Sequence, residues 1–281
     1  MKIIADSGST KSDWRTIDEQ GLITQFRTGG INPYYQSLEV IQKIIKEGLK
    51  KYDDKDISSI YFYGAGCAST QNVKKIKSAF NSILPTTEII VNHDLLAAAH
   101  ALCGHEKGIA CILGTGSNSC LYDGKEIIRN IRSLGYILGD EGSGNYLGKR
   151  LLTDFGRGDL PQSISNRLMK RFDFTLDNFQ EKVYFDDMPA RYLASFSKFI
   201  FQNIKEPYLY ELVYESISAF FENCIMKYDN YEKLPVHFTG SVAFYYGNIV
   251  RKIAADKGIL VKHITESPIA GLAIYYKFKY G

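Results

Sequence analysis

The chain has 281 residues, 45% of them hydrophobic, and carries 34 basic and 31 acidic side chains. This length suggests one large or two modest domains, and the even charge gives no sign of a nucleic-acid or membrane partner. Asp6 comes before any apolar signal region could form, and no run of about 18 apolar residues could span a bilayer. Five scattered cysteines without a C-x-x-C pair predict neither a disulfide framework nor a zinc site. We therefore expect a reduced, cytoplasmic protein.

The first half of the chain opens with three short strands and then alternates helices and strands. The strands are expected at residues 3–5, 14–17 and 22–26, where they form an antiparallel meander. Helices over 38–49 and 72–83, strands over 57–63 and 88–91, and a helix from Asp94 follow. Strands that alternate with helices after a meander predict an α/β domain with a mixed sheet.

The second half begins with the same strand, turn and return strand as the first. A strand at 109–113 leads into the turn Gly114–Asn118 and a return strand at 119–122, which repeats the pattern of Ala5–Thr10. Such a repeat predicts two related halves, which we place at residues 1–112 and 113–281. Residues 160–230 read as a helical insertion. The remaining expected elements are a strand at 236–238, a helix at 242–255, a strand at 259–262 and a helix from Pro268.

The two matching turns are rich in Ser, Thr and Gly, and each follows a buried strand. A strand that ends in small residues and folds back exposes several backbone N–H groups at one point, and such a cluster binds anions such as phosphate. Ordinary hairpins also use Gly and Ser, so for Ser7–Thr10 alone both interpretations stay open. The repetition of the turn favours phosphate binding.

Asp6 stands at the start of the first turn, where the second turn has Gly114. A carboxylate there would repel a nucleotide phosphate unless a cation lay between them, and Mg²⁺ binds carboxylates, waters and phosphate oxygens together. Lys11 directly after the turn could add positive charge near the phosphates, or it could be a solvated lysine. The sequence leaves both interpretations of Lys11 open.

Asp94 lies where a strand gives way to a helix. Aspartate in that position is an ordinary N-cap. In a kinase, an acceptor hydroxyl also needs a nearby carboxylate to take its proton during phosphoryl transfer. The two roles are compatible, and we interpret the preceding His93 as a structural residue.

The densest polar cluster is Gly139–Gly144, which follows a strand-like apolar stretch at 136–138. Its glycines let the backbone approach a ligand and its acids could bind sugar hydroxyls, although a helix N-terminus also favours acids. Phe238–Val242 is a strand-to-helix turn of a common kind. The chain has neither a Walker A lysine motif nor a G-x-G-x-x-G opening a βαβ helix, which argues against P-loop and Rossmann folds.

In this order, four segments resemble the phosphate-1, phosphate-2, sugar-side and adenosine motifs of the actin-like sugar kinases and ATPases. They are Asp6–Lys11, Gly114–Asn118, Gly139–Ser143 and Thr239–Val242. More narrowly, the chain resembles the N-acetylglucosamine kinase branch of the BadF/BadG-type ATPases, from residue 1 to about residue 270. The resemblance implies two actin-like (ribonuclease H-like) α/β domains, each with a mixed sheet and an opening meander. It also implies a cleft between them that closes around ATP, Mg²⁺ and an amino sugar.

The resemblance implies a role for each matching residue. Asp6 would position Mg²⁺ through water, and Asp94 would be the general base for the sugar 6-hydroxyl. The implied ATP contacts are Ser7, Gly8, Ser9, Thr10, Lys11, Gly114, Thr115, Gly116, Ser117, Gly240 and Ser241. The implied sugar contacts are Asn32, Asp94, Gly139, Asp140 and Ser143. Two positions depart from the family: Ser7 stands where a second glycine is usual, and Pro33 alters the sugar-side loop.

We therefore expect a kinase that transfers the γ-phosphoryl group of ATP to N-acetylglucosamine or a close relative such as N-acetylmuramic acid. One alternative is an ATPase that activates a dehydratase or reductase through an iron–sulfur cluster held by cysteine thiolates. Cys111 and Cys120 flank the second turn, but no cluster loop accompanies them. Another alternative is a non-catalytic sugar sensor, which the presence of both Asp6 and Asp94 disfavours. The sugar, the hydroxyl and the oligomeric state, including a homodimer, stay open.

Overall fold

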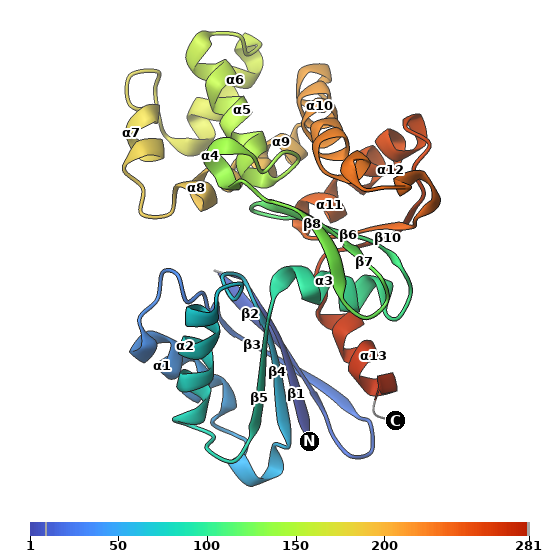
Figure 1. Ribbon diagram of the computed structural model, residues 1–281. Helices are drawn as coiled ribbons and strands as arrows, with labels where there is room; N and C mark the ends of the chain where they lie inside the picture. Colours follow the sequence, from blue (N-terminus) through green and yellow to red (C-terminus); the bar gives the residue numbers. More distant parts are fainter. Residues whose placement is uncertain (9, 280–281) are drawn as a thin grey trace. The chain divides into compact units, whose positions relative to one another are not determined.

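The computed structural model describes residues 1–8 and 10–279. The chain forms two compact units, unit 1 from Met1–His105 with Ser267–Gly281 and unit 2 from Glu106–Glu266 (Figure 1). These units differ from the expected domains 1–112 and 113–281. The boundary between unit 1 and unit 2 comes earlier than expected, because the strand that begins at Gly108 pairs within the second sheet. The last helix belongs to unit 1 because it packs against that unit's sheet and third helix.

Unit 1 is built on a five-stranded mixed sheet in the order β3-β2-β1-β4-β5. Its strands are β1 (Lys2–Ser7), β2 (Lys11–Ile17), β3 (Ile23–Gly29), β4 (Ser59–Gly64) and β5 (Glu88–His93). Strands β1 to β3 form an antiparallel meander, and β4 and β5 run parallel to β1. The helices are α1 (Leu38–Leu49), α2 (Thr70–Asn81), α3 (Asp94–Cys103) and α13 (Ile269–Lys279), with the 3-10 helix η1 (Asp54–Asp56).

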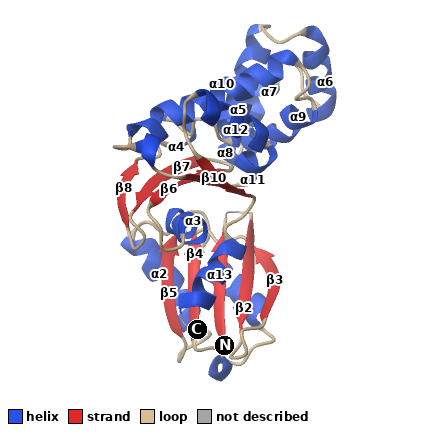
Figure 2. Cartoon of the chain, turned by 90° about the vertical axis from the view of Figure 1, so that its right-hand side faces the viewer, coloured by secondary structure: helices blue, strands red, loops and turns tan. Residues whose placement is uncertain are grey.

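The central strands β1 and β4 are buried on both faces, because consecutive residues are buried and successive side chains point to opposite faces. Ile3 and Ala5 lie in a core with residues of α1 and α2. Ile4, between them, lies in a second core with Tyr61, Tyr63 and residues of α3 and α13. Helices α3 and α13 therefore cover the face opposite α1 and α2, and Figure 2 shows α13 lying along the strands.

Unit 2 has a second five-stranded mixed sheet in the order β10-β9-β6-β7-β8. Its strands are β6 (Gly108–Leu113), β7 (Ser117–Tyr122), β8 (Ile127–Ile131), β9 (Val236–Thr239) and β10 (Val261–Thr265). Again three antiparallel strands come first, and the fourth and fifth strands add in parallel beside the first. Read from the third strand, both sheets have the same order. The predicted α/β class with two related halves is confirmed.

Helices fill the long segment between β8 and β9 and the connection between β9 and β10 (Figure 1). The helices of unit 2 are α4 (Gly135–Leu138), α5 (Gly144–Arg157), α6 (Gln162–Phe172), α7 (Phe179–Tyr184), α8 (Pro189–Ser195), α9 (Ser197–Gln202), α10 (Pro207–Asn223), α11 (Ser241–Tyr245) and α12 (Gly247–Asp256), with the 3-10 helices η2 (Ile225–Lys227) and η3 (Tyr231–Lys233). They share one hydrophobic core with the second sheet. Within the described residues, no helix combines the length and the apolar character needed to cross a bilayer.

Several local predictions are wrong. The strand-like stretch at 136–138 is helix α4, since a run of three apolar residues cannot distinguish a strand from a helical turn. The helix predicted over 242–255 is two helices that meet at Tyr246 and Gly247. The strand predicted at 259–262 starts later, at Val261, because Gly258 in a left-handed conformation first turns the chain out of α12. The edge strand β8 was not predicted, as its central residues are exposed.

Helices α3 and α13 approach each other closely at Gly271. A β-carbon added at Gly271 would lie 2.4 Å from the backbone oxygen of Ala101. We expect Gly271→Ala to reduce the free energy of unfolding by about 1–3 kcal/mol, as overpacking does in a tight interface. Gly247→Ala is the control, because its added β-carbon would meet only the Ile264 side chain at 3.7 Å. Denaturant unfolding of both variants is the measurement, and equal stability of the two would contradict this account of the helix pair.

Candidate active site

The first sheet brings Asp6 and Asp94 to the same side, at the carboxyl-terminal ends of its parallel strands. Asp6 is the next-to-last residue of β1, and Asp94 directly follows β5. Because β1, β4 and β5 are parallel and in register, Ser7 pairs with Gly64 and Gly64 pairs with His93. The carboxyl ends of these strands are therefore level, as expected for a site at the edge of a parallel sheet.

The carboxylate of Asp6 lies in a negatively charged environment. Burial raises its pKa to about 7, and the charges of Asp94 and Asp13 contribute to the rise. The Ser267 hydroxyl donates to Asp6 Oδ2 at 3.3 Å, and this bond and the charge of Lys11 act in the opposite direction on the pKa. Burial also raises the pKa of Asp94. Unit 1 thus concentrates negative charge that its own cations only partly compensate.

Asp13 is a member of this cluster that the sequence analysis did not identify. It pairs with Asp6 across the hairpin of β1 and β2, and its side chain is only 5% exposed. Its Oδ1 accepts a hydrogen bond from Arg27 Nε at 2.5 Å, and Lys11 Nζ lies 3.4 Å from its Oδ2. Lys11 is therefore both exposed and ion-paired. The short hairpin that pairs Ser7 with Ser12 also places Asp6 opposite Asp13. The spacing of the two acids around the predicted turn was the signal that could have identified Asp13.

The first turn is closed by a hydrogen bond from Gly8 N to Lys11 O at 3.0 Å. Ser9 lies outside the described residues. Ser7 is almost completely buried, and its hydroxyl accepts the Ile31 N–H at 2.9 Å and lies 2.5 Å from Ser12 Oγ. The side chain of Ser7 therefore joins the turn to the loop that follows β3. Its contact with ATP stays a prediction, as do those of Gly8, Ser9, Thr10 and Lys11.

The loop that contains Asn32 is held by its own side chains. Asn32 is 6% exposed, its Oδ1 accepts the Tyr34 N–H at 3.0 Å, and its N–H donates to Gln36 Oε1 at 2.8 Å. Lys75 Nζ donates to the backbone oxygens of Pro33, at 3.0 Å, and Gln36. These hydrogen bonds fix the conformation of the loop. They leave the role of Asn32 toward a sugar as a prediction.

Asp94 is not the N-cap of α3. The cap is His93, whose Nδ1 accepts the Leu96 N–H at 3.3 Å. Asp94 is the first helical residue, and its Oδ1 accepts the Leu95 N–H at 2.9 Å. The N-cap interpretation of Asp94 is therefore wrong, while the structural interpretation of His93 is confirmed. The carboxylate lies at the positive end of the helix dipole.

The second turn, in unit 2, is built over Asp140. Gly114 N donates to Gly116 O at 3.0 Å, and Asp140 Oδ1 accepts the Ser117 N–H at 3.3 Å. A β-carbon at Gly116 would lie 2.9 Å from Asp140 Oδ2, so only glycine allows this approach. Asp140 Oδ2 also accepts from Asn145 Nδ2 at 2.7 Å. The carboxylate thus supports the second turn from within unit 2.

The residues of the Gly139–Gly144 cluster are buried more deeply than their predicted sugar contacts suggest. Gly139, Asp140 and Ser143 are all buried, and Asp140 adopts a positive φ of 61°. Ser143 is the N-cap of α5, since its hydroxyl accepts the Tyr146 N–H at 3.3 Å. Their sugar contacts stay predictions, and the observed hydrogen bonds assign Asp140 and Ser143 to the framework of the turn.

Gly240 packs directly on the second turn. Its φ is 114°, and a β-carbon there would lie 2.3 Å from Leu113 O and 3.1 Å from Gly114 N. Gly240 N donates to Thr265 O at 3.0 Å. The turns after β6 and β9 and the end of β10 therefore meet at the carboxyl edge of the second sheet. Thr115 and Ser241 present exposed hydroxyls there.

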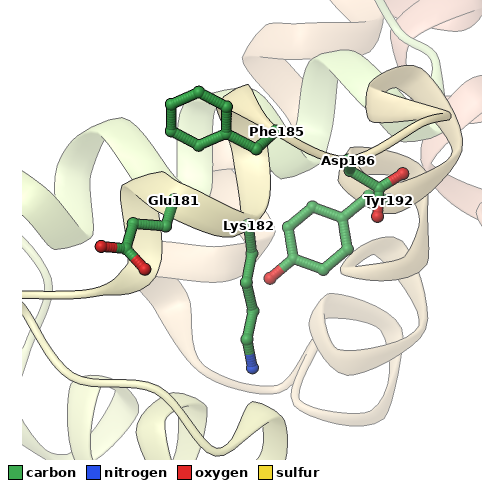
Figure 3. A pocket seen from close by; sticks show the side chains of 5 residues that line it. All are labelled: Glu181, Lys182, Phe185, Asp186 and Tyr192. Atoms are coloured by element: carbon green, nitrogen blue, oxygen red, sulfur yellow. The ribbon is translucent and has the colours of Figure 1, made fainter.

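A hollow of about 390 Å³ lies elsewhere in unit 2 (Figure 3). It is lined by Glu181, Lys182, Phe185, Asp186 and Tyr192. These side chains belong to the helical insertion and to none of the segments predicted to bind ATP or sugar, so the hollow is not part of the candidate site. Among the described residues, no group of three or more His, Cys, Asp and Glu side chains is arranged to hold a metal ion.

Sequence comparison identifies relatives of the chain. Residues 5–159 match the model of the BadF/BadG/BcrA/BcrD ATPase family. An N-acetylmuramic acid/N-acetylglucosamine kinase from Clostridium acetobutylicum is 33% identical over 153 residues, which are 51% of this chain and 49% of that kinase. The chain thus spans about half the length of this curated relative.

Structural comparison extends the likeness to the full length. A Porphyromonas gingivalis protein proposed to be an N-acetylglucosamine kinase is 39% identical, with a TM-score of 0.94 over 100% of both chains. A second protein with the same proposed activity, from Chromobacterium violaceum, is 17% identical, with a TM-score of 0.76 over 98% of both chains, and shows the fold alone. The expected actin-like fold with two α/β domains is confirmed. Because the family model matches more than half of its residues, the chain belongs to the BadF/BadG/BcrA/BcrD ATPase family.

Proposed function

We propose that this protein is a kinase that transfers the γ-phosphoryl group of ATP to a hydroxyl of an amino sugar, with N-acetylglucosamine and its 6-hydroxyl as the first candidates. The relatives that carry this activity in their names support the substrate class, and the ATPase family supports ATP as the donor. The observation that carries the proposal is the pair of carboxylates, Asp6 and Asp94, at the edge of the first sheet beside a closed glycine turn.

The charge around Asp6 fits a divalent cation. Burial raises the pKa of Asp6, the charges of Asp94 and Asp13 raise it further, and the Ser267 hydrogen bond and the Lys11 charge offset these effects only in part. Mg²⁺ in kinases is held by one or two carboxylates together with waters and substrate phosphates, so a dedicated three-residue protein site is not needed. We propose that Asp6 holds Mg²⁺ through water. When bound, the ion neutralises charge on the phosphate oxygens.

Asp94 is the proposed general base. Burial raises its pKa, which makes the carboxylate a better proton acceptor than an exposed aspartate. In the proposed reaction, the sugar hydroxyl loses its proton to Asp94 while its oxygen bonds to the transferred phosphorus and ADP leaves. Asn32 is proposed to contact the same sugar from the loop after β3.

The glycine turns are the proposed ATP contacts. Gly8 to Lys11 would offer backbone N–H groups from unit 1, and Gly114 to Ser117 would do so from unit 2. Gly240 and Ser241 are proposed to approach the adenosine, since the absence of a side chain at Gly240 brings the backbone close to the second turn. Asp140 enters this proposal as the support of that turn.

The electron-transfer alternative finds little support in the cysteines. Cys111 pairs with Ser119 and Cys120 pairs with Ala110 on neighbouring strands, so the two thiols point to opposite faces of the sheet. Both are completely buried. These two residues do not fit a shared cluster. The sensor alternative predicts sugar binding without turnover, and the assay below tests it.

We expect Asp94→Asn to reduce kcat by at least about a hundredfold, because an amide cannot accept the proton. The measurement is a coupled ADP-release assay with Mg²⁺ and a panel of amino sugars that includes N-acetylglucosamine and N-acetylmuramic acid. Asp187→Asn is the control, since Asp187 is exposed in the helical segment of unit 2. Equal rates for Asp94→Asn and wild type would remove Asp94 from the mechanism, and no turnover with any sugar would exclude the kinase.

We expect Asp6→Asn to stabilise the ligand-free protein at pH 8. The folded pKa of Asp6, about 7, exceeds the ordinary value of 3.8, so the stability that Asp6 contributes is fully present below pH 4 and is lost as the pH rises through 7. The full shift corresponds to roughly 4 kcal/mol, and partial exposure of the side chain reduces the expected gain to about 1–3 kcal/mol.

The measurement is thermal unfolding of Asp6→Asn and wild type at pH 4 and pH 8 without Mg²⁺ or nucleotide. The difference between the two proteins should be small at pH 4 and largest at pH 8. Asp187→Asn should show no such dependence. A constant difference at both pH values would show that Asp6 does not lie in the unfavourable environment described above.

A further inference from the structure

The chain passes from unit 2 back to unit 1 between Glu266 and Ser267. On the unit 2 side, Thr265 ends β10 and accepts the N–H of Gly240 at 3.0 Å. On the unit 1 side, the hydroxyl of Ser267 donates to Asp6 Oδ2 at 3.3 Å. The first residue of the chain's return to unit 1 is therefore hydrogen-bonded to the proposed magnesium carboxylate.

We propose that Ser267 is a positioning residue that orients the Asp6 carboxylate. The inference rests on the proposed function, in which Asp6 holds Mg²⁺ through water. Ser267 does not touch a reacting atom in this account. It determines the rotation of the carboxylate, because a hydrogen bond to one oxygen fixes the direction of both.

The start of α13 is anchored firmly, as a residue that orients the Asp6 carboxylate requires. Pro268 follows Ser267 and restricts the backbone there, and the buried residues Ile269 and Leu272 lie in the same core as Ile4. Ile4 is on β1, two residues before Asp6. Gly271 packs against the backbone of Ala101 in α3, the helix that begins with Asp94. Ser267 thus directly precedes α13, and this helix contacts both β1, which carries Asp6, and α3, which begins with Asp94.

Ser267 also has a structural role that the test must separate. Its hydroxyl accepts the Ile269 N–H at 3.5 Å, as a residue at a helix start does. Ser267→Ala removes both hydrogen bonds, and Ser267→Thr keeps both. Ser267→Asp keeps an acceptor for the helix N–H but replaces the hydrogen-bond donor to Asp6 with a further carboxylate. Capping alone predicts that Thr and Asp both replace serine, whereas positioning of Asp6 predicts that only Thr does.

The experiment measures kcat and KM for the sugar and for ATP in these three variants and in wild type. We expect Ser267→Ala to reduce kcat by about tenfold or more while the sugar KM changes by less than about twofold, since the lost interaction acts on the transferred group. Ser267→Thr should stay within about threefold of wild type, and Ser267→Asp should be no better than alanine. Ser58→Ala is the matched control, because the exposed Ser58 hydroxyl donates only to the backbone oxygen of Met1.

A binding measurement keeps the inference independent of turnover. Calorimetry with a non-hydrolysable ATP analogue, with and without Mg²⁺, reports whether Asp6 is placed for the metal. The gain in affinity on adding Mg²⁺ should be retained in Ser267→Thr and reduced in Ser267→Ala and Ser267→Asp. Thermal unfolding identifies any variant that fails to fold, and the comparison of Thr with Asp then decides.

The outcomes of the two proposals are distinguishable. If wild type phosphorylates no amino sugar, the proposed function fails, while the calorimetric comparison still tests Ser267. If wild type is active and Ser267→Asp matches it in kcat and in the effect of Mg²⁺, the serine is only a helix cap and the inference is overturned. Wild-type behaviour of Ser267→Ala would overturn it equally.

Discussion

Negative charge concentrated at one edge of the first sheet is the constraint on which the rest of the site depends. The parallel pairing of β1, β4 and β5 makes their carboxyl ends level, and the tight β1–β2 turn adds Asp13 opposite Asp6. Burial and the neighbouring charges of Asp94 and Asp13 raise the pKa of Asp6, so its ionised carboxylate opposes folding. Such an arrangement is typical of functional sites rather than of a stable framework.

A few cationic and hydrogen-bonding side chains partly compensate this negative charge. Arg27 and Lys11 pair with Asp13, and Ser267 donates to Asp6. The carboxylates of Asp6 and Asp94 stay poorly compensated, and their two environments differ. Asp94 begins a helix and accepts the Leu95 N–H, whereas Asp6 lies near the end of a strand opposite Asp13. This asymmetry suits the separate proposed roles, a proton acceptor at Asp94 and a carboxylate for a metal-bound water at Asp6.

Unit 2 has the same topology as unit 1 but no acid where its first strand ends. Gly114 replaces the aspartate, and the turn is supported from beneath by Asp140. The close packing of Gly240 on Leu113 brings a second set of backbone groups to the same edge. The duplicated fold thus places acids at the strand ends of one unit and a turn without an acid at the matching place in the other, which is consistent with the proposed roles of the two turns toward magnesium and phosphate.

Sequence patterns predicted the features that depend on local order. The repeat of strand, turn and strand, the positions of Asp6 and Asp94, and the α/β class all follow from neighbouring residues. Features that depend on distant pairing could not be predicted in this way. Ser267 contacts Asp6 across most of the chain length. Asp140 was predicted only as a sugar contact, and its buried hydrogen bonds with Ser117 and Asn145 were not foreseen. The exposed edge strand β8 lacked the apolar alternation that marks other strands.

The central claim is that Asp6 makes nucleotide binding depend on magnesium. The most direct test is calorimetric titration of wild type and Asp6→Asn with a non-hydrolysable ATP analogue, each with and without Mg²⁺. The account predicts that Mg²⁺ strengthens binding to wild type by at least about tenfold and has little effect on Asp6→Asn. The same dependence on Mg²⁺ in both proteins, or no binding to either, would contradict it.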